Sequence, residues 1–131
     1  MKRKSGFLLA IMFSVAAGLM ASEQRGDWLA KVPEKDRVRV NPLAHDDTAT
    51  AGGAQLFAQH CAACHGELAE GVGRRPGLRT ARVRDASDGE LQWLLRNGSL
   101  AHGMPAWSNL PEVQRWQLVR YLHSLSGDRG N

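Results

Sequence analysis

The sequence predicts an all-α domain with three main helices and two long loops. A capping box marks the start of one helix, and leucines at helical spacing mark another. A third is indicated by cap-forming residues that precede an apolar run. No stretch alternates polar and apolar residues for long enough to form a strand, and no internal repeat is visible. We divide the 131 residues into a leader over 1–21, an extension over 22–46, one domain over 47–126 and a short tail over 127–131.

The leader has the composition of a secretory signal peptide. Lys2–Lys4 give it a positive start, an uncharged and mostly apolar run follows over Phe7–Ala21, and small residues close that run. Cleavage is expected near residues 17–21. The run is short for a helix that spans a bilayer, which needs about 20 apolar residues. We therefore predict an exported protein, in contact with a membrane only if the signal is retained as an anchor.

The charge balance gives little support for a nucleic-acid partner. The chain has 17 Lys and Arg against 13 Asp and Glu, a formal net charge of +4. Three of the basic residues and none of the acidic residues belong to the leader, so its removal leaves +1. Basic residues do cluster after the first helix. This cluster is either part of a solvated loop, or a docking patch or counter-charge for an anionic cofactor. The clustered residues are Arg74, Arg75, Arg79, Arg82 and Arg84.

The extension over 22–46 is predicted to be irregular, because Pro33 and Pro42 interrupt it and no periodicity persists. It either lies over the surface of the domain or tethers the domain to something else. The first helix is expected to begin near Asp47 or Thr48, either of which can cap it.

This first helix runs on into the motif CAACH, with Leu56 and Phe57 on its apolar face. Gly52 and Gly53 each cost about 1 kcal/mol relative to alanine inside a helix. A helix that tolerates both glycines is expected to approach another backbone closely. We expect that neighbour to be the last helix.

The remaining elements follow in order. Residues 66–86 are rich in Gly and Arg and include a proline, so we predict a long loop. The sequence from Ser87 to Glu90 is a capping box, which opens a short helix that Gly98 ends. A second loop continues from Gly98 to Leu110.

The last helix is predicted from Pro111 to about Leu125, since proline suits a helix start. Leu118, Tyr121, Leu122 and Leu125 stand at positions i, i+3, i+4 and i+7 and form one apolar face. Gly127 is placed to stop the helix.

Both cysteines of the chain lie in CAACH, residues 61–65. A C-x-x-C spacing serves dithiol exchange, zinc binding or, as C-x-x-C-H, covalent attachment of haem. A disulfide between Cys61 and Cys64 would close too small a loop to stabilise the fold. Dithiol exchange is typical of a βαβ context, which is not visible. Zinc would need a fourth ligand such as His60 or His102, and no second paired cluster exists.

Haem attachment accounts for these features together. Cys61 and Cys64 would form thioether bonds to the macrocycle, and His65 would coordinate the iron. A domain of about 85 residues with two long loops buries little apolar surface, and such a domain usually needs a staple or a cofactor in its core. One covalently bound haem c would supply that core.

The second iron ligand must come from far along the chain. Met104 is the only methionine outside the leader, and it lies between Gly103 and Pro105 in the second loop. A thioether is the usual partner of histidine in electron-transfer haem sites. His102 is the rival ligand and would give a bis-histidine site of lower potential.

These motifs resemble the class I, monohaem c-type cytochromes of bacterial periplasms. The resemblance covers residues 48–126: Gly53 and Phe57 before the cysteines, CAACHG, Pro76 with Leu78, GMPAW and LVRYL. It implies the class I cytochrome c fold, three main helices and two long loops around one haem. It also implies that the Pro76 carbonyl accepts a hydrogen bond from His65 and that Leu78 touches the haem. The position of C-x-x-C-H, far from the end of the chain, excludes cytochromes of the four-helix-bundle type.

The resemblance implies a periplasmic, monomeric electron-transfer protein that is not itself an enzyme. Its iron, held by His65 and Met104, would pass single electrons from a dehydrogenase donor to an oxidase or another cytochrome. An alternative is a dedicated haem subunit of a dehydrogenase or oxidase complex, with residues 22–46 as a binding arm. A third alternative, peroxidase activity or gas binding, requires an open or labile position at the iron. Trp107 and the arginine cluster are candidates for contacts with the haem propionates.

Overall fold

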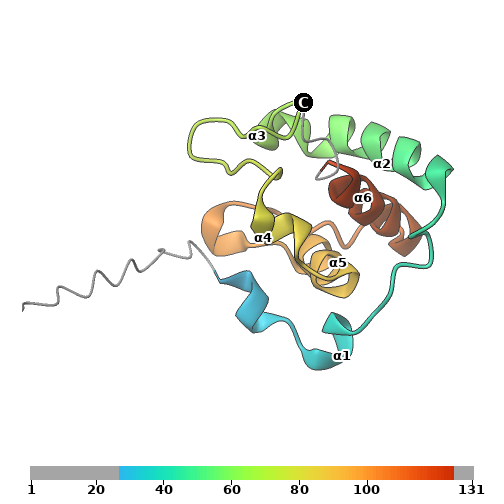
Figure 1. The fold of residues 1–131 in the computed structure, drawn as a ribbon. Coiled ribbons are helices and arrows are strands. Elements are labelled where there is room, and N and C mark those ends of the chain that lie inside the picture. Colours follow the sequence, from blue (N-terminus) through green and yellow to red (C-terminus); the bar gives the residue numbers. More distant parts are fainter. Residues whose placement is uncertain (1–26, 126–131) are drawn as a thin grey trace, which may run out of the picture.

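The computed structural model describes residues 27–125, which form a helical domain without strands in that range; only two isolated β-bridges occur there (Figure 1). The leader over 1–21, its cleavage near 17–21, the tail over 127–131 and the stop at Gly127 lie outside the described residues. The helices are η1 Trp28–Lys31, α1 Glu34–Arg37, α2 Asp47–His60, α3 Ala62–His65, α4 Ala81–Arg84, α5 Asp88–Asn97, η2 Leu100–His102 and α6 Glu112–Ser124. Within the described residues, no helix is both long and apolar enough to cross a membrane.

Helices α2 and α6 lie side by side and form the framework of the domain (Figure 1). A Cβ atom on Gly53 would lie 2.1 Å from the backbone oxygen of Gln117 in α6 and 2.7 Å from the Cβ of Tyr121. This confirms the predicted close approach to the last helix. Gly52 differs, because a Cβ there would meet only the side chain of Gln117. Next to the contact, the rings of Phe57 and Tyr121 pack with their centroids 5.3 Å apart.

The start and end of α2 differ in detail from the prediction. The cap is Asp46, one residue before the expected pair, and its carboxylate accepts hydrogen bonds from the amides of Thr48 and Ala49. The hydroxyl of Thr48 also donates to this carboxylate and lowers the pKa of Asp46. The helix ends at His60 rather than continuing through CAACH. Cys61, with φ −119° and ψ −34°, separates α2 from the single turn of α3.

Helix α5 begins as predicted. The Ser87 hydroxyl accepts a hydrogen bond from the amide of Glu90, and the Glu90 carboxylate accepts one from the amide of Ser87, which completes the capping box. Gly98 follows the last residue of the helix. The prediction of a continuous loop over 66–86 is wrong in one part. This stretch contains α4, whose first turn is capped by the hydroxyl of Thr80.

The apolar face of α6 points into the core, as predicted. Leu118, Leu122 and Leu125 are buried, and Tyr121 packs against the same cluster. The helix runs from Glu112 to Ser124, and Pro111 is its cap residue. Together these elements confirm the predicted all-α class, with α2, α5 and α6 as the main helices.

Residues 27–46, called the N-terminal segment below, lie over the domain and contain the short helices η1 and α1 where we expected irregular structure (Figure 1). Asn41 is buried and holds the segment on two helices. Its backbone amide donates to the Asp88 carboxylate of α5 (3.0 Å), and its side-chain amide donates to the Trp116 carbonyl of α6 (2.9 Å). The guanidinium of Arg39 lies 5.1 Å from the centroid of the Trp116 ring.

Candidate haem site

One cavity of about 1620 Å³ lies between the two long loops and the main helices. It is larger than the roughly 300–1,000 Å³ of ordinary small-molecule pockets. Every residue that the sequence assigned to haem attachment, to iron ligation or to the pocket around His65 lines it, although these residues come from three separate parts of the chain. They are Cys61, Cys64, His65, Pro76, Leu78 and Met104.

His65 is held in one orientation by the first loop. Its Nδ1 lies 2.8 Å from the backbone oxygen of Pro76. A carbonyl oxygen only accepts, so Nδ1 carries the proton and donates, which leaves the Nε2 lone pair for a metal. The backbone turns sharply after His65, where Gly66 has φ 85°, and the amide of Gly71 donates back to the His65 carbonyl (2.7 Å).

The two cysteines are half-buried free thiols. Burial, and to a lesser extent the neighbouring Cys64, raise the pKa of the Cys61 thiol to about 11. Reactive cysteines of dithiol-exchange sites have the opposite property, a lowered pKa that supplies thiolate at neutral pH. The environment of Cys61 therefore disfavours the exchange alternative. Arg75 donates a hydrogen bond to the sulfur of Cys64.

The second loop places Met104 by backbone geometry. Ser99 and Met104 form a pair of hydrogen bonds, from each amide to the other carbonyl (2.9 and 3.1 Å). Gly98 and Gly103 on either side have φ 68° and 79°, which glycine adopts at little cost. At Gly98 a Cβ would also lie 2.6 Å from the backbone of Pro105, so this tight loop has no room for a larger residue.

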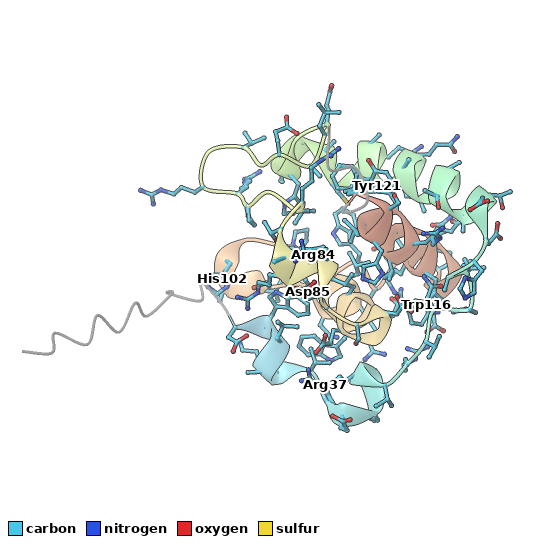
Figure 2. The ribbon with its side chains drawn as sticks, viewed as in Figure 1. Arg37, Arg84, Asp85, His102, Trp116 and Tyr121 are labelled. Atoms are coloured by element: carbon cyan, nitrogen blue, oxygen red, sulfur yellow. The ribbon has the colours of Figure 1, made fainter. Side chains whose placement is uncertain are left out.

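Met104 and His102 have different surroundings, although both line the cavity. Met104 is half-buried and packs against the hydrophobic core. His102 is exposed at the periphery of the domain, and its Nδ1 lies 3.0 Å from the Ser99 hydroxyl (Figure 2). The packing favours the sulfur of Met104 over the imidazole of His102 as an iron ligand.

The predicted arginine cluster divides into two groups. Arg74, Arg75 and Arg82 line the cavity. Arg79 instead donates to the Leu68 carbonyl (2.6 Å), and Arg84 pairs with Asp85 (2.8 Å) (Figure 2). Only the first group is therefore placed to meet the charge of an anionic cofactor.

Trp107, the other predicted propionate candidate, also lines the cavity. Its ring centroid lies 5.2 Å from that of His60, so the two rings pack against each other.

Two residues that matter to the site are placed only by the structure: the sequence left Trp28 open as a haem-wall, core or surface aromatic, and it did not single out Arg115. Trp28 of η1 lines the cavity. Arg115 of α6 is buried beneath the end of the second loop, where its guanidinium donates to the backbone oxygens of Trp107 and Leu110 and to the side-chain oxygen of Gln92. Burial lowers the pKa of Arg115. Neither role leaves a local signal, because each depends on contacts with residues far away in the chain.

The residues fit a covalently attached haem. Two thiols, an imidazole and a thioether line the same cavity, and buried apolar side chains complete its wall. The apolar lining includes Phe57, Leu91, Leu95, Leu118 and Leu122. Within residues 27–125, no three His, Cys, Asp or Glu side chains converge on a common point, so a zinc donor set is not found there.

Residues 48–122 match the model of the family described as cytochrome c oxidase, cbb3-type, subunit III. The chain is 32% identical over 98 residues to the cbb3-type cytochrome c oxidase subunit CcoP of Azospirillum brasilense, an alignment that covers 69% of this chain and 33% of the relative. It is 31% identical over 91 residues to cytochrome c550 of Pseudomonas aeruginosa, which covers 66% of this chain and 63% of that protein. The chain thus spans about a third of the length of the CcoP relatives.

Among solved structures, the fold is similar to cytochrome CL of the methylotrophic bacterium Methylophaga aminisulfidivorans. The TM-score is 0.56 at 27% identity, and the superposition covers 65% of this chain and 58% of the other.

Proposed function

Because the chain belongs to the family of cytochrome c oxidase, cbb3-type, subunit III, and is a monohaem c-type cytochrome with covalently bound haem c, we propose that it carries single electrons between redox proteins of the periplasm. The observation that carries this proposal is the meeting of Cys61, Cys64, His65 and Met104 at one mainly apolar cavity. The protein would act as a carrier and not as an enzyme in its own right.

We assign each of these side chains one role. Cys61 and Cys64 would hold the cofactor through thioether bonds, while His65 and Met104 would coordinate its iron. When bound, haem supplies a one-electron couple between ferric and ferrous iron. The hydrogen bond from His65 to Pro76 fixes the imidazole. The paired backbone hydrogen bonds between Ser99 and Met104 fix the loop that carries the sulfur.

This arrangement supports electron transfer over ligand or substrate chemistry. Because His65 and Met104 would both coordinate the iron, no open position would remain on the metal for a substrate. The loops on both sides are held by backbone hydrogen bonds, so the ligands need to move little when the charge of the site changes. Leu78 and Pro76 line the same cavity, and the Pro76 carbonyl also bonds His65.

Carbon monoxide binding to the reduced protein tests the ligand assignment. We expect the wild type to bind none at neutral pH, Met104→Ala to bind it readily, and His102→Ala to behave as the wild type. Binding by the His102→Ala variant alone would transfer the ligand role to His102. Binding by the wild type would favour the gas-binding or peroxidase alternative.

A second candidate function is supported by the CcoP relatives, which are named as subunits of a cbb3-type oxidase. In that case the chain would be a haem subunit of an oxidase or dehydrogenase complex. Gel filtration of the native periplasmic extract separates the two functions. A free carrier elutes as a small monomer, whereas a subunit co-elutes with its complex.

Export and the fate of the leader need their own test. We propose that the chain reaches the periplasm and is cleaved near residues 17–21. The mass of the protein purified from its cell envelope gives the mature N-terminus directly. An intact leader would instead mean a membrane-anchored cytochrome.

A further inference from the structure

The wall of the cavity includes a residue from outside the part of the chain that matches the family model. That match begins at residue 48, whereas Trp28 lies in η1 of the N-terminal segment. Trp28 is half-buried, lines the cavity and packs against the hydrophobic core. This chain therefore adds an aromatic side chain to the cavity of the family domain.

Contacts on both sides fix Trp28 in place. Before it, the carboxylate of Asp27 pairs with Arg82 of α4, which also lines the cavity (3.0 Å). After it, the carbonyl of Leu29 accepts a hydrogen bond from the guanidinium of Arg37 (2.9 Å). The backbone at Trp28 is thus held between a salt bridge and a hydrogen bond.

Arg37 in turn is anchored to the main fold. Its guanidinium pairs with Glu90, the buried acid of the α5 capping box, and its carbonyl accepts a hydrogen bond from the Ser87 hydroxyl (2.8 Å). A Cβ on Gly89 would lie 1.9 Å from the carbonyl oxygen of Asp36, so glycine at that position lets α1 lie directly on α5. The N-terminal segment, which carries Trp28, is therefore attached to α5, whose leucines also line the cavity.

We infer that Trp28 is a wall residue of the haem site, which excludes water from the cofactor and raises the midpoint potential of the iron. The inference rests on haem occupying the cavity as proposed above. Oxidation adds one positive charge to the site, and a surrounding poor in water stabilises that charge less than water does. Solvent access and local dielectric are among the means by which a protein sets a haem potential.

The test compares three variants of the full chain, matured with haem in an export-competent host. Trp28→Ala removes the ring, and Trp28→Leu retains an apolar side chain in case alanine impairs folding. Leu29→Ala is the matched control, because Leu29 also lies in η1 and packs on the core but does not line the cavity. Midpoint potentials come from spectroelectrochemical titration, and stability comes from thermal unfolding of the same samples.

We expect Trp28→Ala to lower the midpoint potential, Trp28→Leu to lower it less, and Leu29→Ala to leave it near the wild-type value while lowering the unfolding temperature. Equal potentials for Trp28→Ala and Leu29→Ala, or no shift in either Trp28 variant, would overturn the inference and leave Trp28 a purely structural residue. Failure of the proposed function would appear elsewhere, as a wild-type spectrum without histidine and methionine ligation.

Discussion

The α2–α6 contact and the cavity formed by the two loops are built in opposite ways. Between the helices, Gly53 brings the backbones so close that no side chain separates them, and the rings of Phe57 and Tyr121 fill the space alongside. Between the loops lies a cavity of about 1620 Å³, whose shape is maintained by hydrogen bonds at His65 and Met104. Protein atoms alone fill the space between the two helices, whereas the space between the loops is to be filled by the cofactor.

Removing both thiols should have the largest effect of the changes considered, because it removes the attachment of the cofactor between the loops. In the Cys61→Ala, Cys64→Ala double variant we expect complete loss of covalently bound haem, because no other cysteine exists. Haem staining after denaturing electrophoresis measures this. Met104→Ala is the control and should keep the stain, since it alters an axial ligand and not the attachment. Stain retained by the double variant would disprove thioether attachment.

Gly53→Ala should be the most damaging change to the helix pair. The new methyl group would overlap the Gln117 backbone, which cannot move without shifting α6, so we expect a loss of about 3 kcal/mol in unfolding free energy. Gly52→Ala is the matched control. There the methyl group would meet only the flexible side chain of Gln117, and the better helix propensity of alanine offsets that contact by about 1 kcal/mol. Denaturant unfolding followed by circular dichroism measures both, and equal losses would contradict the close approach.

Arg115 joins the two regions, because it lies on α6 and bonds the end of the second loop. Arg115→Met should lower the unfolding free energy by about 2 kcal/mol, since buried carbonyls at Trp107 and Leu110 lose their donor. It should also loosen the Met104 loop, which would show as an earlier loss of the methionine-ligated spectrum on warming. Arg120→Met is the control on the same helix. Its partner Asp47 is fully exposed, so the loss should stay below about 1 kcal/mol.

The cap of α2 should give the smallest effect, visible only against pH. The hydrogen bond from the Thr48 hydroxyl, aided by two backbone amides, lowers the pKa of Asp46 below its ordinary value of 3.8. The folded state then binds fewer protons than the unfolded state. Its extra stability is present above about pH 4 and is lost as the pH falls through the lowered pKa. Asp46→Asn retains a cap without the charge, so the stability difference from wild type should shrink below pH 4. A difference that grows in acid would contradict this sign.

The sequence was most informative where a structural feature depends on neighbouring residues. The capping box from Ser87 to Glu90 and the leucine spacing of α6 are local patterns, and both were found as predicted. The glycine pair in α2 pointed to a close neighbour because its cost needed a compensating contact. Only the structure shows that Gly53 makes the backbone contact and that Gly52 meets a side chain.

The sequence was least informative where several neighbouring residues could equally well cap a helix, or where a contact joins residues that are far apart in the sequence. Asp46, Asp47 and Thr48 are all good caps, and only the backbone geometry selects Asp46. Thr80 caps a four-residue helix within the predicted loop, and the glycines and arginines of that stretch gave no helical pattern from which to predict it. The neighbours of Trp28 hold it at the cavity: Asp27 pairs with Arg82, 55 positions away, and the Leu29 carbonyl bonds Arg37, 8 positions away. No periodicity or motif marks such a contact.

The near-infrared charge-transfer absorption of the ferric protein, which arises from thioether coordination, tests the central claim most directly. The cavity geometry predicts the band in the wild type and in His102→Ala, and its absence in Met104→Ala. A band that survives Met104→Ala, or that is missing from all three proteins, would contradict the ligation of the iron by His65 and Met104.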